Sequence, residues 1–178
     1  MNLIIMREAG YQEAIVGLSL SHGITIERAR EVAVKLAPKD GGHNKVLESI
    51  KVWLDVLAPR YWWQEADTYR LSTKQSGSTM HTIQKKHLEQ YDFEAPIYPP
   101  TLLHLNALVN AYMESKSVED LVKLKNELPE GFLQRRIWVM NYKCLRNILL
   151  QRTTHRLPQW KAFCAHIREY SLYPELLP

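Results

Sequence analysis

The chain has 178 residues, of which 46% are hydrophobic and 24% are charged. This length is enough to bury the core of one domain, residues 1–178, and the composition excludes a disordered chain. The net charge of +4 favours an anionic partner. Because basic and acidic residues are interspersed, a phosphate-bearing small molecule is favoured over nucleic acid. No apolar stretch is long enough for a membrane span or a signal peptide, so we expect a cytoplasmic protein without a membrane partner.

The first forty residues predict two short helices joined by a tight turn. Residues 8–21 carry apolar side chains at helical spacing, and Gly23 follows as a natural stop. Thr25 then caps the second helix. Two helices joined in this way suggest a helix-turn-helix, but Glu27 and Glu31 lie among the arginines of the second helix and would repel a phosphate backbone. DNA binding is therefore not expected.

A strand, a helix and an ambiguous segment follow. The strand alternates apolar and polar side chains, and its covered face carries Ile50, Val52, Leu54 and Val56. A proline then begins a helix over residues 60–67. Residues 69–82 are rich in serine and threonine and predict a loop or an irregular strand. Part of this segment is either a solvated turn or a nest of hydrogen-bond donors for an anion, formed by Ser76, Gly77, Ser78 and Thr79.

The C-terminal part of the chain predicts four helices. Residues 101–115 and 117–127 form the first two, and Ser117 caps the second of them. A long third helix is expected over residues 130–151, because prolines bracket this stretch and its apolar residues recur at three-and-four spacing. Residues 159–170 form the last helix, and the tail that follows is expected on the surface.

Asn141, Asn147 and Arg152 interrupt the apolar pattern of the expected long helix. Asn141 and Arg152 are eleven residues apart, which returns them to nearly the same face at about 100° per residue. In one interpretation, the amides bond neighbouring backbone and Arg152 meets a carboxylate. In the other, the three side chains converge on a planar polar ligand such as a nucleotide base or a phosphate.

The spacing of cysteine and histidine argues against a disulfide and against a metal site. Cys144 lies within a helical pattern beside core residues, so buried free thiols are favoured for it and for Cys164. The seven histidines form no HxxxH pair, and the chain has no CxxC pair. No zinc site is expected.

The order of these segments resembles the flavin-dependent thymidylate synthases. That family has an AP-aromatic-x-x-Q segment, an RHRxxSxNExSxR signature, and a C-terminal helix with LP, a long gap, NARSLxNFLxLR and QW. This chain has APRYWWQ ending at Gln64, and its C-terminal part matches at Asn141, Leu145, Asn147, Arg152, Gln159 and Trp160. One extra residue after Arg152 puts either His155 or Arg156 in the place of the family's helix-end histidine. The resemblance covers residues 43–82 and 128–165.

The signature motif departs from the family pattern. Asp67, Thr68 and Tyr69 stand where the family has RHR, the triplet that meets the flavin dinucleotide. Further along, Ser72 is kept, Lys74 and Gln75 replace Asn and Glu, Gly77 replaces the later Ser, and Thr79 replaces the final Arg. A carboxylate at Asp67 would weaken binding of a pyrophosphate, which argues against flavin binding in the family's manner.

The resemblance implies an α+β fold with a small mixed sheet flanked by helices and a long C-terminal helix lining a ligand cleft. It also implies a homo-oligomer, because the family forms tetramers with sites between subunits. Together with the possible anion nest, it leads us to expect substrate contacts from Gln64, Ser72, Ser76, Gly77, Ser78, Thr79 and Arg152. For the cofactor it implies contacts from Asn141, Asn147 and His155.

Three functions are consistent with these residues. The leading hypothesis is a nucleotide-binding protein that sequesters, senses or modifies a (deoxy)nucleotide or another phosphorylated small molecule without the usual flavin site. The first alternative is an active flavin- and folate-dependent thymidylate synthase that methylates dUMP with FAD bound in a rebuilt site. The second is a non-catalytic structural or partner-binding module. The sequence assigns no catalytic residue.

Overall fold

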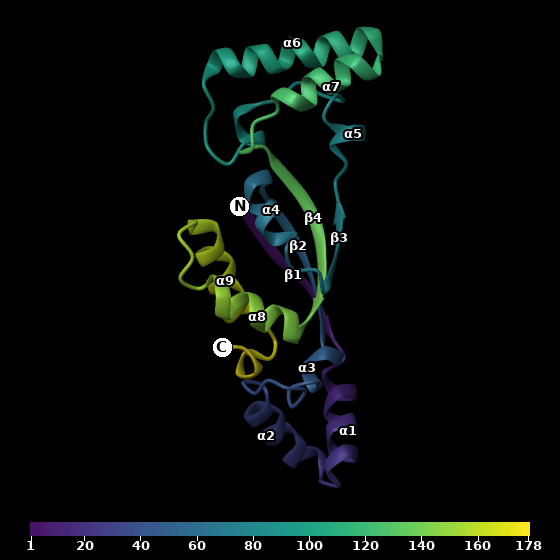
Figure 1. The fold of residues 1–178 in the computed structure, drawn as a ribbon, viewed down its shortest axis with the longest axis vertical. Coiled ribbons are helices and arrows are strands. Elements are labelled where there is room, and N and C mark those ends of the chain that lie inside the picture. Colours follow the sequence, from purple (N-terminus) through teal and green to yellow (C-terminus); the bar gives the residue numbers. More distant parts are fainter. The chain divides into compact units, whose positions relative to one another are not determined.

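The computed structural model describes residues 1–178, which form two compact units. Unit 1 consists of Met1–Asn2, Leu57–Asp67 and Gln75–Arg136, and unit 2 consists of Leu3–Val56, Thr68–Lys74 and Ile137–Pro178. A four-stranded sheet has the order β1-β2-β4-β3, with β1 at Asn2–Ala9, β2 at Lys51–Pro59, β3 at Ser72–Ser76 and β4 at Leu133–Asn141 (Figure 1). The predicted α+β class with a small sheet and flanking helices is confirmed.

Hydrogen bonds at the two ends of the β2–β4 pair give its direction. The Tyr142 N–H donates to the Ile50 carbonyl at 2.9 Å, and the Arg60 N–H donates to the Phe132 carbonyl at 3.1 Å. Residue numbers rise along one strand as they fall along the other, so β2 and β4 are antiparallel. The predicted covered face of β2 is confirmed, because Val52 and the other apolar residues of this face are fully buried.

Unit 1 contains four helices, a 3-10 turn and a small apolar core. The helices and the turn are α4 (Arg60–Ala66), α5 (Thr79–Thr82), η1 (Gln90–Asp92), α6 (Pro99–Ser115) and α7 (Val118–Glu127). Helices α6 and α7 run side by side as a hairpin (Figure 1). The core cluster comprises Ile83, Leu88, Phe93, Leu105, Val109, Leu121, Leu124 and Leu128. The predicted cap of α7 is confirmed, because the Ser117 hydroxyl accepts from the Asp120 N–H at 3.1 Å.

In unit 2, five helices and a 3-10 turn pack in consecutive pairs. They are α1 (Tyr11–His22), α2 (Ile26–Leu36), α3 (Val46–Ser49), α8 (Tyr142–Arg152), α9 (Pro158–Tyr170) and η2 (Pro174–Leu176). Helix α3 packs against α1 and α8, and α8 packs against α9. The predicted cap of α2 is confirmed, because the Thr25 hydroxyl accepts from the Arg28 N–H at 3.3 Å. None of the helices in either unit combines the length and the apolar composition needed to cross a membrane.

The turn between β1 and α1 requires glycine. Gly10 has φ +92°, in the left-handed region, and a Cβ built there would lie 2.4 Å from the Ser49 carbonyl oxygen. Any side chain would therefore clash with the backbone that leads from α3 into β2.

The expected long helix over residues 130–151 is wrong in its first part. Residues 133–141 form strand β4, and helix α8 starts only at Tyr142. Buried Trp138 and Met140 alternate with half-buried Val139, which is the period of a strand, and β-branched and aromatic side chains favour a pleated surface. Asn141 is the cap of α8 rather than a residue within a helix.

Two further differences concern the ends of unit 2. Residues 2–9, for which the sequence predicts no strand, form strand β1, which pairs with β2. The tail was expected on the surface, yet Leu176 is only 1% exposed and η2 packs against α2 and α9. Cys144 and Cys164 are both buried and unpaired, as predicted.

The Glu8 carboxylate holds together three segments of unit 2. The Tyr142 hydroxyl donates to Glu8 Oε1 at 2.6 Å, and the Leu172 N–H donates to Glu8 Oε2 at 2.6 Å. Burial raises the pKa of the Tyr142 phenol far above its usual value of 10.0, and the Glu8 carboxylate raises it further. Tyr142 therefore remains a neutral donor in the folded protein.

Tyr142→Phe should reveal this shift as a pH dependence of stability. The folded pKa is raised, so the contribution of Tyr142 is complete below about pH 10 and is lost as the pH rises further, because only the unfolded phenol ionises there. The free energy of unfolding that the substitution removes should therefore shrink by about 1 kcal/mol between pH 10 and pH 11. Urea denaturation at these pH values measures it. Tyr98→Phe, at an exposed tyrosine, is the control; equal pH profiles for both variants would contradict the assignment.

Candidate functional site

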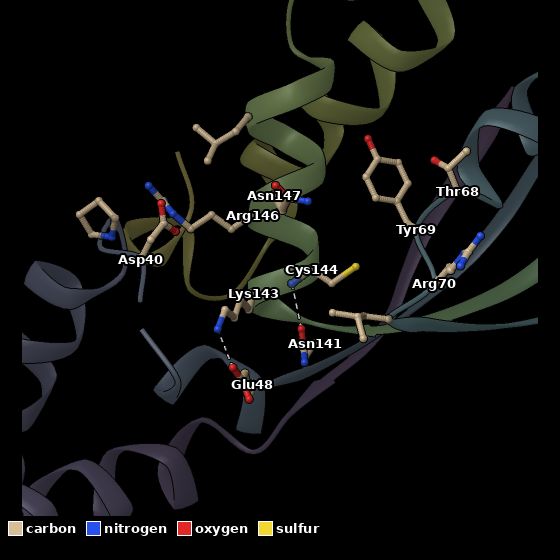
Figure 2. Close-up of a pocket in the computed structure, with 13 residues that line it drawn as sticks. Asp40, Glu48, Thr68, Tyr69, Arg70, Asn141, Lys143, Cys144, Arg146 and Asn147 are labelled. Atoms are coloured by element: carbon tan, nitrogen blue, oxygen red, sulfur yellow. Dashed lines mark hydrogen bonds and ion pairs between the residues drawn. The ribbon is translucent and has the colours of Figure 1, made fainter. Parts of the chain in front are cut away.

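A cavity of about 680 Å³ lies in unit 2 (Figure 2). Its lining comes from three stretches of the chain, namely residues 38–48, residues 68–71 before β3, and residues 141–150 on α8. Apolar side chains such as Leu71 and Leu150 alternate around it with charged and amide side chains. Ligand cavities in proteins have this size and this mixed chemistry.

Three cations and two carboxylates line the cavity. Lys143 donates to Glu48 at 2.6 Å, so this pair is largely neutralised. Burial lowers the pKa of the Arg146 guanidinium, and the nearby Asp40 carboxylate opposes this shift. Arg70 is the third cation. The charged side chains that line the cavity therefore have a net charge of one positive unit, which favours an anionic ligand.

Two amides predicted to bind a cofactor, Asn141 and Asn147, line this cavity. The Asn141 Oδ1 accepts from the Cys144 N–H at 2.8 Å, so the cap of α8 fixes its orientation. The Asn147 Oδ1 accepts from Gln151 Nε2 at 3.0 Å, one helical turn further along. The Cys144 side chain also faces the cavity, and burial raises the pKa of its thiol, so it is a thiol and not a thiolate near neutral pH.

Arg152 is held between two aromatic rings rather than at the cavity wall. Its Nε donates to the Tyr69 hydroxyl at 2.8 Å. Its guanidinium carbon lies 4.7 Å from the Trp160 ring centre and 5.5 Å from that of Tyr69. His155 contacts the same Trp160, with ring centres 6.4 Å apart. Arg152 and His155 therefore support the cavity through Tyr69 and Trp160, and of these four residues only Tyr69 lines it.

Gln64 belongs to unit 1, whereas Arg152 belongs to unit 2. The exposed Gln64 side chain donates from Nε2 to Glu130 Oε2 at 2.9 Å. Glu130 also pairs with Arg60 at 3.5 Å. Neither Gln64 nor Arg152 is among the residues that line the cavity.

Ser72, at the start of β3, is engaged within unit 2. Its hydroxyl donates to the Tyr69 carbonyl at 2.6 Å and accepts from Lys74 Nζ at 3.1 Å. Lys74 also lies over the Trp138 ring, 5.0 Å from its centre. Ser72 therefore fixes the Tyr69 backbone that enters the cavity.

The four residues of the predicted anion nest, Ser76 to Thr79, belong to unit 1. The Gly77 N–H donates to the Arg135 carbonyl at 2.8 Å, so this donor is committed to pairing with β4. The Thr79 hydroxyl accepts from Lys125 Nζ at 2.7 Å. Ser76 ends β3, and Ser78 precedes α5. An anion at this segment would therefore rely on hydroxyl groups rather than on the Gly77 backbone.

Sequence reasoning missed the partner of Asp67. Within unit 1, Arg136 Nη1 donates to both oxygens of Asp67, at 2.9 and 3.1 Å. The Arg136 guanidinium also stacks on Trp63, 4.5 Å from the ring centre. The stacked guanidinium, bonded through one nitrogen to both carboxylate oxygens, neutralises Asp67, which stands where the family has its first signature arginine. Asp67 and Arg136 are 69 residues apart, and no local pattern connects them.

The roles of Tyr69, Gln151 and Arg146 were also missed. Gln151 is four residues after Asn147 in a stretch that the sequence correctly predicts to be helical, so this spacing could have identified the pair. Tyr69 had no comparable signal, because its partners on α8 lie more than eighty residues away.

Comparison with known proteins gives a similarity of fold. No family model matches the chain, and no curated protein matches it in sequence. Two crystal structures of the flavin-dependent thymidylate synthase ThyX from Helicobacter pylori, both with FAD and dUMP, match it over 99% of its length and over 98% and 97% of theirs. Their TM-scores are 0.79 and 0.80, and each is 16% identical in sequence. The chain therefore has the fold of these flavin-dependent thymidylate synthases.

Proposed function

We propose that the chain is a nucleotide-binding protein that sequesters, senses or modifies a (deoxy)nucleotide. The observation that carries this proposal is the match of fold along nearly the whole chain to proteins whose crystals contain dUMP and FAD. A shared fold does not transfer a function by itself, so the residues of the cavity must fit such a ligand.

The cavity in unit 2 suits a nucleotide in size and in chemistry. Its volume of about 680 Å³ lies within the range of small-molecule sites. Asn147 and Tyr69 supply an amide and an aromatic ring for a base, while Arg70 and Arg146 supply cations for a phosphate. Charge-assisted hydrogen bonds to a phosphate contribute roughly 1.5 to 3 kcal/mol each, enough to retain the ligand without the family's signature arginines.

The signature positions support the absence of the usual flavin site. Asp67 carries a negative charge that Arg136 already neutralises. Tyr69 is buried, and its hydroxyl is engaged with Arg152. Neither residue offers a cation to a pyrophosphate, which is what the resemblance assigns to this triplet.

A second candidate is flavin-dependent methylation of dUMP with a rebuilt FAD site. The observation in its favour is that Arg70, Lys143 and Arg146 bring three cations to one cavity, enough to contact a pyrophosphate. Freshly purified protein that is yellow would support this candidate. Colourless protein that takes up no added FAD would remove it.

Isothermal titration calorimetry tests nucleotide binding directly. We expect heat with a uridine or thymidine nucleotide and a Kd that rises with salt concentration, because phosphate contacts are screened by ions. Uridine, thymidine and cyclic nucleotides form the panel. Folded protein that gives no heat with any of them would contradict the proposal.

We further propose a homo-oligomer, as the resemblance implies. The strand β1 lies at the edge of the sheet and exposes Ile4 and Met6, at 52% and 56%. Such an edge is commonly covered in an assembly. Light scattering of the purified protein gives the mass, to be compared with 20.8 kDa for one chain.

A further inference from the structure

Four side chains of unit 2 form a continuous chain of hydrogen bonds that ends at the cavity. Arg152 Nε donates to the Tyr69 hydroxyl oxygen at 2.8 Å, and the Tyr69 hydroxyl donates to Gln151 Oε1 at 2.9 Å. Gln151 Nε2 then donates to Asn147 Oδ1 at 3.0 Å. Of these four residues, Tyr69 and Asn147 line the cavity, and Figure 2 shows them on the segment before β3 and on α8.

The direction of this chain is fixed at its first member. A guanidinium has only donors, so the Tyr69 oxygen must accept from Arg152 and its proton must go to Gln151. The Gln151 amide then has its oxygen toward Tyr69 and its NH₂ toward Asn147. As a result, Asn147 must offer its oxygen to Gln151 and keep its own NH₂ for another partner.

The chain keeps this direction over a wide range of pH. Burial raises the pKa of the Tyr69 phenol, although the hydrogen bond from Arg152 opposes the shift, so Tyr69 retains its proton near neutral pH. Titration of Tyr69 therefore does not reverse the direction of the chain near neutral pH.

We propose that Tyr69 and Gln151 are positioning residues that hold the Asn147 amide with its NH₂ toward the cavity, so that Asn147 selects a ring carbonyl oxygen. This inference rests on the proposed function and adds a specificity to it. The carbonyl belongs to the dione edge that uracil and the flavin ring share and that cytosine lacks. A cytosine amino group would meet the Asn147 NH₂ donor to donor, leaving both without an acceptor.

Pre-organisation is what makes the amide selective. An isolated asparagine can rotate to offer either its oxygen or its NH₂, and it would then accept both kinds of base. With the Asn147 oxygen already bonded to Gln151, rotation breaks that bond. The free energy needed to break this bond lowers the affinity for a base that presents an amino group, relative to one that presents a carbonyl oxygen.

Two variants test the inference by the ratio of Kd values for dCMP and dUMP. The wild-type protein should prefer dUMP by about tenfold. Asn147→Asp should reverse the preference, because a carboxylate still accepts from Gln151 but presents only acceptors to the cavity. Tyr69→Phe keeps the ring beside Trp160 but removes the hydroxyl, so the ratio should fall to within about threefold of one. Tyr170→Phe, at an exposed tyrosine on α9, should leave it unchanged.

Calorimetry with FAD identifies whether the Asn147 amide contacts a carbonyl oxygen of uracil or one of the flavin ring. If FAD affinity falls in both variants while the nucleotide ratio is constant, the carbonyl is that of the flavin ring, and the inference holds. If both variants keep the wild-type ratio and the wild-type FAD affinity, the inference is overturned. Wild-type protein that binds neither nucleotide nor FAD would overturn the proposed function itself. Because the Asn147 side chain is exposed, Asn147→Asp gives a readout even if Tyr69→Phe does not fold.

Discussion

Arg152→Ala is expected to weaken dUMP binding by about 10- to 100-fold. Arg152 heads the hydrogen-bond chain that orients Asn147, and its guanidinium holds the Tyr69 hydroxyl at 2.8 Å. Without Arg152, the Tyr69 hydroxyl can turn its proton away from Gln151, so the Asn147 NH₂ is no longer held toward the cavity. The cavity also loses the positive charge of a nearby guanidinium. Calorimetric titration of dUMP into the wild-type protein and the variant measures the loss.

Lys161→Ala is the matched control for charge, because this exposed lysine on α9 carries the same charge outside the cavity. It should change the dUMP affinity less than twofold, an effect on the order of a screened surface charge. If Arg152→Ala binds dUMP as tightly as the control and loses only stability, Arg152 has a structural role alone, and its part in orienting Asn147 is contradicted. If neither the wild-type protein nor the variant binds dUMP and only stability changes, the chain is a structural or partner-binding module.

Trp160→Ala should lower the free energy of unfolding by about 3 to 5 kcal/mol. Trp160 is fully buried and makes edge-to-face contacts with Phe163, at 5.7 Å, and with Tyr69, at 6.2 Å. Its ring also supports the Arg152 guanidinium. The substitution opens a large cavity behind the site, and neighbouring side chains can refill it only in part.

Urea denaturation followed by circular dichroism measures this loss. Trp160→Phe is the comparison, since a smaller ring keeps most of the apolar contact and should cost about half as much. A loss below about 1 kcal/mol for Trp160→Ala would show that the ring does not belong to the core of unit 2.

Local chemistry explains which elements could be predicted from the sequence. The caps at Thr25 and Ser117 and the alternation in β2 are signals carried by adjacent residues, and the structure has all three. Residues 133–141 have apolar side chains that suit either a helix or a strand. Pairing with β2, more than seventy residues earlier, selects the strand, and no local pattern contains that partner.

The same distinction applies to the site. Asn141 and Asn147 could be proposed because both match a family motif within one short stretch of sequence, and both line the cavity. Tyr69 could not, because its role comes from a contact with Gln151, 82 residues away. Arg136 similarly acquires its role from Asp67 only when β4 is formed.

Glu8 joins β1 to residues that the ribosome adds much later. The Tyr142 hydroxyl is 134 residues further along, and the Leu172 N–H is 164 residues further along. Contacts that distant close late in folding, because the intervening chain must first be ordered. A nascent chain that has not reached Leu172 therefore leaves the Glu8 carboxylate without one of its two partners, and the three segments that it joins are not yet held together.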